Sequence, residues 1–315
     1  DTTKGVLVEV NGPPTEGQFK DKAGYWEVVI TEPQATWLAG YLFGGGATVK
    51  ARAVAGGASG GNACIIGLST APGVNSITMD NNNIISNPGC AIYSNSNFSV
   101  DNNSEIAGTA VVAGSFTGKV DKADIANPVT GATPVADPYA DVPVPSTCSG
   151  TASITSGGAK TAGSYCNGVN IGNNTTVTLS SGTYLIGKNF SIGNSVTFNS
   201  TGPVTLVFMP GTTFTLGNNA AFHFDAPTTG DYAGVAMIGR NMGSSIIAWN
   251  NAIFDIQGAI YFPNQTLSIK NNFNSSKCTQ VVANIVQIKN NADMASTCPG
   301  TGIRSPGGST IALME

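Results

Sequence analysis

A short corner motif, Gly-Asn-Asn or Gly-Asn-Ser between two alternating strands, constrains the fold of this chain more than any other feature. Its first asparagines in the three clearest copies, Asn173, Asn194 and Asn218, are 21 and 24 residues apart. Looser copies of the same corner occur at Asn82, Asn102, Asn250, Asn271 and Asn290. A step of roughly 20 residues per strand-turn-strand unit indicates a solenoid whose coils bury their apolar faces by stacking on one another.

Asparagine suits such a corner because it tolerates the left-handed backbone region and hydrogen-bonds within its own turn. When coils stack at a strand spacing of about 4.8 Å, aligned asparagines can pair their amides into a ladder. The sequence therefore predicts an all-β chain with a parallel β-helix. The alternative is an antiparallel sandwich with asparagine pairs in ordinary loops, but a sandwich has no reason to repeat one corner at one coil length.

Composition narrows the class of protein and its partners. The chain has 315 residues, of which 41% are apolar and only 10% charged, with 40 glycines, a profile typical of β-rich extracellular proteins. The net charge of −4 gives no basic surface for nucleic acid. No apolar run is long enough to cross a bilayer. We therefore expect membrane attachment only through a segment upstream of Asp1.

Six cysteines and a single histidine, His223, favour disulfides over zinc sites, which need close cysteine pairs or several histidines. Sequence alone leaves 15 connectivities. Loops of about one coil favour three pairs: Cys64 with Cys90, Cys148 with Cys166, and Cys278 with Cys298. These bonds predict an oxidising compartment, the periplasm or the cell exterior; reduced core cysteines are the alternative.

Changes of pattern along the chain suggest its organisation. Residues 1–55 form a small β-rich unit, 56–62 a Gly/Ser/Ala linker, and 63–315 the β-helix. The segment 120–148 contains five prolines, which cannot donate to a strand ladder, so we expect an excursion along the side of the solenoid. A solvated connector is the simplest interpretation of this excursion and a binding surface the alternative. The repeat fades into a predicted C-terminal cap at 299–315.

Candidate catalytic groups are few. Glycoside hydrolysis needs two carboxylates about 5–9.5 Å apart, and the best candidate pair is Asp225 with Asp255, 30 residues apart, a separation that can place them on neighbouring coils. Their flanks look like ordinary strand faces, and His223 lies between two phenylalanines, so we expect it to face solvent or a neighbouring coil. Asp80 and Asp101 begin calcium-like loops that no glutamate completes at the twelfth position. The sequence predicts no catalytic residue, cofactor or metal site, and hence no enzyme.

Several segments resemble the TadG-like proteins of Flp/Tad pilus assembly. They are residues 25–54, ending in Val-Lys-Ala-Arg-Ala-Val, the asparagine-rich coils with Cys90, and three further stretches, Val135 to Pro145, Gly182 to Ile186 and Gly258 to Asn264. The resemblance covers nearly the whole chain. It implies an upstream hydrophobic helix that anchors the protein in the envelope and a role at a pilus or cell surface, and it supplies no catalytic residues.

Together these patterns predict a non-enzymatic, exported structural or adhesive protein at the cell surface. The expected partners are pilus or surface-fibre proteins, or further copies of the chain in a filament. The alternative is a β-helix that binds or cleaves surface polysaccharide, which rests on analogy of fold.

Overall fold

The computed structural model describes residues 5–17, 19–21, 25–34, 47–57, 63–85, 90–101, 104–118, 128–271, 274–275, 277–291, 293–294, 301–306 and 311–313. These residues form only β-strands, with no helix among them. No helix capable of crossing a membrane occurs within the described ranges. The chain divides into two compact units, residues 1–59 with 309–315, and residues 60–308.

The first unit is a four-stranded antiparallel sheet in the order β1-β2-β3-β29. Its strands are β1 (Leu7–Asn11), β2 (Tyr25–Gln34), β3 (Ala47–Gly57) and β29 (Ile311–Leu313). Two predicted boundaries are corrected here. β3 continues to Gly57, so the linker does not begin at residue 56, and residues 58–62 lie outside the described ranges. Residues 311–313 were assigned to a solenoid cap, but they pair with the edge of β3, where they satisfy its backbone groups.

The two sides of this sheet differ because successive side chains point to opposite faces. On one side Glu27 is fully buried and accepts hydrogen bonds from Arg52 Nε at 2.5 Å and Thr15 Oγ1 at 2.8 Å. The Arg52 hydrogen bond, with those of Thr15 and Asn11, lowers the pKa of Glu27 to about 2. The opposite side is apolar and exposed, with Trp26 the largest side chain on it.

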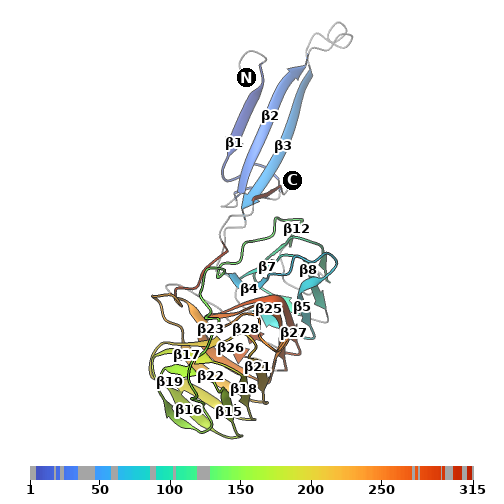
Figure 1. The fold of residues 1–315 in the computed structure, drawn as a ribbon. Helices are drawn as coiled ribbons and strands as arrows, with labels where there is room; N and C mark the ends of the chain where they lie inside the picture. The colour runs from blue at the N-terminus through green and yellow to red at the C-terminus, as the bar shows by residue number, and fades with distance from the viewer. Residues whose placement is uncertain are drawn as a thin grey trace. The chain divides into compact units, whose positions relative to one another are not determined.

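The second unit is a parallel β-solenoid of about 9 turns, which confirms the predicted fold class (Figure 1). Its strands lie on three faces, and the long strand β25 (Ile253–Lys270) passes through all three. The first, which we call the strap face, contains β4 (Ala63–Gly67), β7 (Ala91–Ser94), β10 (Thr109–Val112), β12 (Val129–Thr130), β14 (Gly163–Tyr165), β17 (Gly182–Ile186), β20 (Val204–Phe208), β23 (Val235–Gly239) and the first half of β27 (Thr279–Lys289).

The other two faces complete each coil. The ladder face contains β5 (Asn75–Asp80), β8 (Asn97–Asp101), β11 (Phe116–Thr117), β15 (Val169–Ile171), β18 (Asn189–Ile192), β21 (Thr213–Leu216), β24 (Ile246–Asn250) and the second half of β27. The carboxylate face contains β6 (Ile84–Ile85), β9 (Glu105–Ile106), β13 (Gly158–Lys160), β16 (Thr176–Leu179), β19 (Thr197–Ser200), β22 (Ala221–Asp225), β26 (Asn274–Ser275) and β28 (Asp293–Met294). Inward side chains stack from coil to coil, as in the column Phe198, Phe222 and Phe254.

The coils are not stacked in chain order. β27 pairs in parallel with β4 and β5, with Val281 opposite Ile65 and Val286 opposite Ile77. The stack therefore begins with the coil at residues 154–171, runs through residues 274–294, and continues without a break into residues 63–117. We call the junction of β27 and β28 with β4, β5 and β6 the seam.

An asparagine ladder runs along one corner of the stack and crosses the seam. The backbone N–H groups of Asn194 and Asn218 donate to the side-chain oxygens of Asn173 and Asn194, at 2.7 and 2.8 Å. Above them the side-chain amides donate in turn, Asn250 to Asn218 (2.7 Å), Asn271 to Asn250 (2.6 Å), Asn290 to Asn271 (2.8 Å) and Asn81 to Asn290 (2.9 Å).

The upper end of the same corner contains Asn81 and the predicted Asn82, and both residues have positive φ. Asn81 donates the hydrogen bond across the seam. Asn102 lies outside the described residues.

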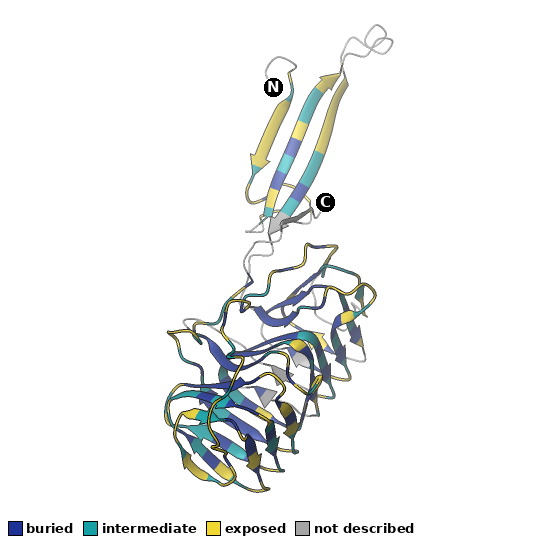
Figure 2. Cartoon of the chain, viewed as in Figure 1, coloured by how far each residue is buried: buried dark blue, intermediate teal, exposed yellow. Residues whose placement is uncertain are grey.

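The proline-rich excursion returns the chain to the far end of the stack. Residues 131–150, which we call the strap, lie across the outer side of the strap face. β20 and β23 are buried at every position, so their outward side chains are covered as well as those that face the core (Figure 2). Val135, Tyr139 and Val142 of the strap are themselves buried. The described part of the excursion therefore lies along the side of the solenoid, as predicted, and packs against it through these buried side chains.

Polar contacts fix the strap at its middle. Asn95 donates to and accepts from the backbone of Val135 at 2.8 and 2.7 Å. The hydroxyl of Tyr139 donates to Gln280 Oε1 at 2.5 Å and accepts from the backbone N–H of Arg304 at 3.0 Å. Arg240 donates to the carbonyl of Tyr139 at 2.6 Å. Burial raises the pKa of Tyr139 above its usual range, so its hydroxyl stays protonated.

Disulfides tie neighbouring segments together. Two bonds join cysteines that the spacing had paired, Cys64 with Cys90 on adjacent coils and Cys148 with Cys166, which fastens the end of the strap to the first coil of the stack. Cys278 is also disulfide-bonded, whereas its predicted partner, Cys298, lies outside the described residues. The bonded pairs are compatible with an oxidising compartment.

Candidate functional site

The structure brings the predicted carboxylate pair together on the carboxylate face. β22 and β25 are neighbours, with His223 opposite Asp255 and Asp225 opposite Gln257. The ammonium group of Lys277 lies 2.9 Å from Asp225 Oδ1 and 3.9 Å from Asp255 Oδ2. His223 Nδ1 lies 3.5 Å from the same oxygen of Asp255. One cation therefore stands between two carboxylates, with an imidazole beside them.

Strand alternation explains why these side chains point outward. Phe222 and Phe224 on β22, and Phe254 on β25, are buried in the core, so the residues between and beside them face solvent. His223 thus faces the neighbouring coil, as its position between phenylalanines had suggested. Sequence reasoning missed Lys277, although it follows Asp255 by 22 residues, about one coil, and this spacing could have placed it beside the pair.

Two hollows lie on this part of the solenoid and share Pro203 in their linings. The smaller, of about 230 Å³, is lined by His223, Asp225 and Lys277 together with the turn at Gly202 and Pro203. The larger, of about 470 Å³, begins on the other side of Pro203, and we call it the corner groove. Its size falls in the range of ordinary ligand pockets.

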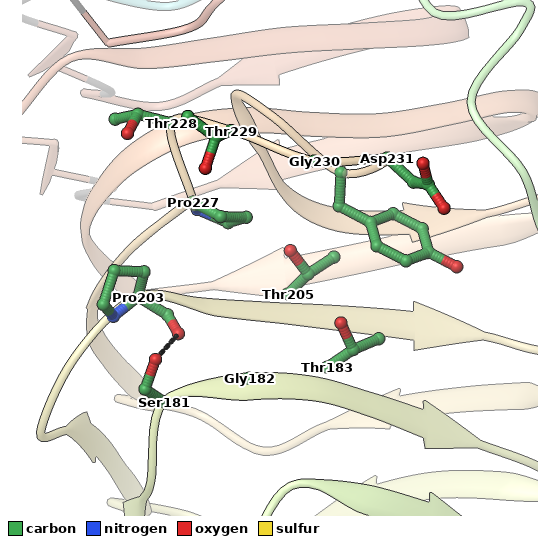
Figure 3. A pocket seen from close by; sticks show the side chains of 11 residues that line it. Ser181, Gly182, Thr183, Pro203, Thr205, Pro227, Thr228, Thr229, Gly230 and Asp231 are labelled. Carbon is green, nitrogen blue, oxygen red and sulfur yellow. Dashed lines mark hydrogen bonds between the residues drawn. The ribbon is translucent and has the colours of Figure 1, made fainter.

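The corner groove forms because one turn of the solenoid is longer than its neighbours. Adjacent coils pass from the carboxylate face to the strap face through the short turns at Ser181 and Pro203, whereas the next coil uses residues 226–234. This longer loop overhangs the short turns, and Figure 3 shows Pro227, Thr228 and Thr229 above Ser181, Pro203, Thr183 and Thr205. The loop corresponds to the widest step in the asparagine spacing.

Hydrogen bonds hold the loop in place. The backbone N–H of Gly234 donates to the carbonyl of Pro227 at 2.7 Å, and that of Val235 to the carbonyl of Tyr232 at 2.9 Å. Thr205 Oγ1 donates to the carbonyl of Val235 at 2.7 Å. Burial, with the nearby Asp231 carboxylate, raises the pKa of Tyr232, so its hydroxyl is a neutral donor and acceptor.

The other predicted site residues are structural. Asp80, at the first calcium-like loop, is paired with Lys289 at 3.1 Å across the seam. Asp101, at the second, ends strand β8. Within the described part of the chain, no group of three or more His, Cys, Asp or Glu side chains is placed to hold a metal ion. Near Pro203, charged side chains line one hollow and polar and apolar side chains line a second.

No family model, curated protein or solved structure matches this chain.

The cluster can act chemically in two ways. As a set of fixed donors and acceptors it can hydrogen-bond a polar ligand, since Lys277 and His223 donate while Asp225 and Asp255 accept. As an acid and base pair it would need one carboxyl group to hold a proton while the other is ionised. Lys277 already pairs with both carboxylates, so the three side chains form a fixed set of donors and acceptors beside the hollow.

Proposed function

We propose that this protein is an exported, non-enzymatic structural and adhesive element displayed at the cell surface, in association with a pilus or another surface fibre. The observation that carries the proposal is the unbroken stack of coils, in which the asparagine ladder and the parallel strands cross the seam. Neighbouring coils are joined by hydrogen bonds between their strands and along the asparagine ladder, which suits a rigid element. The resemblance to TadG-like proteins supports the pilus as the setting.

Two further features support an exposed, oxidising location. Disulfides persist outside the cytosol. One described bond joins two adjacent coils, and the other joins the end of the strap to the first coil of the stack. The low content of charged residues and the many hydrogen bonds of the turns also suit an element that must stay folded outside the cell, away from cytosolic chaperones.

Localisation and inactivity are the two parts of this proposal to test. Protease treatment of intact cells should remove the protein, whereas a cytosolic marker should remain. Non-reducing mass spectrometry of the protein recovered from cells should show its cysteines oxidised. Recovery of a protease-resistant, thiol-reduced protein from the cell interior would contradict the proposal, as would turnover of a polysaccharide by the purified chain.

The second candidate function is cleavage of a surface polysaccharide. The observation that favours it is that Asp225, Asp255, His223 and Lys277 lie in contact with one another beside a hollow. Reducing-end release and ultraviolet absorbance at an unsaturated product would detect hydrolysis and elimination on a panel of glycans. Replacement of both aspartates by alanine should abolish any such turnover; activity that survives the double substitution excludes this pair as its source.

A further inference from the structure

The corner groove has the chemistry of a sugar-binding surface. A sugar ring presents hydroxyl groups at its edge and apolar C–H groups on its faces. The groove offers hydroxyls from Ser181, Thr183 and Thr229 on opposite walls. The ring of Tyr232 and the pyrrolidine rings of Pro203 and Pro227 supply flat apolar surface in the same cavity. Tyrosine is suited to such contacts because it combines a large apolar ring with a polar end.

Several polar groups of the groove are available to a ligand. Among the described residues, no protein atom hydrogen-bonds the side chains of Thr183, Thr228, Thr229 or Asp231 (Figure 3). By contrast, Thr205 and Ser181 donate to carbonyls at 2.7 and 3.1 Å and so help to build the walls. The site thus has fixed walls and unengaged donors and acceptors facing the space between them.

Packing behind the loop makes the groove a preformed site. Gly234, at the end of the loop, has φ +74°, and a Cβ atom there would lie 2.1 Å from the carbonyl oxygen of Gly302. The loop is therefore pressed against residues 301–306 on one side and bonded internally on the other. A loop held in this way loses little conformational freedom when a ligand binds, which favours affinity.

Charge selects among sugars. Asp231 lies in the groove, and Asp225 lines the smaller hollow, where Lys277 pairs with it and with Asp255. These groups comprise three carboxylates and one ammonium. A polymer of uronic acids would bring its own carboxylates against these groups, which costs free energy in a partly desolvated site. Uncharged sugars carry no such penalty.

We propose that the corner groove binds an uncharged polysaccharide, with Tyr232 contacting the face of a sugar ring and Thr183 and Asp231 hydrogen-bonding its hydroxyls. The chain would run along the corner past Pro203 toward Lys277. This inference rests on the proposed adhesive function, and it names the ligand class of that adhesion and the place where it binds.

Calorimetric titration of the complete purified chain tests the site with four probes: dextran, cellohexaose, chitohexaose and polygalacturonate. We expect saturable binding of at least one of the three uncharged probes and none of polygalacturonate. Tyr232→Ala should weaken that binding by about tenfold, equivalent to about 1.4 kcal/mol. Thr183→Tyr, which fills the groove, should remove it. The matched control is Thr215→Tyr, the same change at an exposed outward position on β21, which should bind as the unmodified chain does.

Failure of all three uncharged probes to bind at millimolar concentrations would overturn the inference, and so would preferential binding of polygalacturonate. Equal loss of binding in the Thr183→Tyr and Thr215→Tyr chains would also count against it, because the effect would then not belong to the groove. If Thr183→Tyr fails to fold, Tyr232→Ala decides by itself. None of these results bears on cell-surface display or disulfide state, so the proposed structural role stands or falls separately.

Discussion

Replacement of Tyr139 by phenylalanine should loosen the strap from the solenoid. The substitution keeps the buried ring and removes only the hydroxyl oxygen. That oxygen donates to Gln280 Oε1 at 2.5 Å and accepts from the backbone N–H of Arg304 at 3.0 Å. Gln280 is fully buried on β27, and its amide donates across the seam to the carbonyl of Ala63 at 2.7 Å. The hydroxyl therefore connects the strap, the seam and the C-terminal segment of this unit.

The expected loss of stability follows from these contacts. A neutral intramolecular hydrogen bond contributes about 1 kcal/mol, and a buried acceptor left without a partner costs about 1–3 kcal/mol. Gln280 Oε1 would be such an acceptor, so Tyr139→Phe should lower the free energy of unfolding by about 2–3 kcal/mol. For a unit of this size the midpoint of thermal unfolding should fall by about 5–10 °C.

Thermal and urea unfolding monitored by circular dichroism, with disulfides intact, would measure this change. Hydrogen exchange should also show faster exchange of strap amides such as Val142, whose N–H donates to the carbonyl of Tyr139 at 3.0 Å. Tyr232→Phe, which removes a hydroxyl at the surface, is the matched control and should change stability by less than about 0.5 kcal/mol. Equal stability of the two variants would refute the argument that the Tyr139 hydroxyl secures the strap.

Three further changes test other parts of the structure. Asn290→Ala removes two ladder hydrogen bonds at the seam and places alanine at φ 63°. It should therefore lower the free energy of unfolding, measured by thermal unfolding, by about 2–3 kcal/mol. Asn290→Gly, which tolerates that φ, should lower it by less, and the reverse order would contradict the argument from backbone strain. The Arg52 hydrogen bond lowers the pKa of Glu27 from 4.5 to about 2, so ionised Glu27 stabilises the small sheet fully above pH 4.5 and this stabilisation is lost as the pH falls through about 2. Glu27→Gln should abolish this pH dependence of stability, measured by amide exchange in β2. If the dependence persists in the variant, another group causes it. Replacing both Cys148 and Cys166 by serine opens a loop of sequence separation 18 and should cost about 3 kcal/mol in chemical unfolding, whereas no change would mean that the strap end is held without the bond.

The fold class could be predicted because the repeat is local. Each Gly-Asn-Asn or Gly-Asn-Ser corner places a left-handed residue about one coil after the last, as at Asn174, Ser195 and Asn219, and the alternating strands on each side mark which side chains face inward. These signals need no knowledge of distant residues. The disulfide pairs Cys64–Cys90 and Cys148–Cys166 were accessible for the same reason, since their separation is close to one coil.

The stacking order could not be read from the chain. A parallel coil has an open strand edge at each end, and any other coil with matching corners can pair with it. Nothing in the sequence near Ala63 indicates that its upper and lower neighbours are residues 91–94 and 281–283. One signal for the strap was present and was missed: strands such as Val204–Phe208 are apolar at nearly every position, which is typical of a strand covered on both faces.

The candidate site was half predicted. The sequence paired Asp225 with Asp255, and strand register places Asp225 opposite Gln257 and Asp255 opposite His223, on neighbouring strands. The corner groove depends on the direction in which three successive turns of different length project from one corner. The length of a turn alone does not determine that direction. Here the packing of Gly234 against Gly302 decides it.

By itself the sequence determined the repeating unit, the inward and outward sides of each strand, and the cysteines that one coil can join, because all of these follow from residues within about twenty positions of one another. Only the tertiary structure decided which coil rests on which, what covers the outer side of the strap face, and where a groove opens beside the carboxylates. Those choices are made by contacts between segments as far apart as Asn81 and Asn290, and such contacts depend on the complementary surfaces of already formed coils.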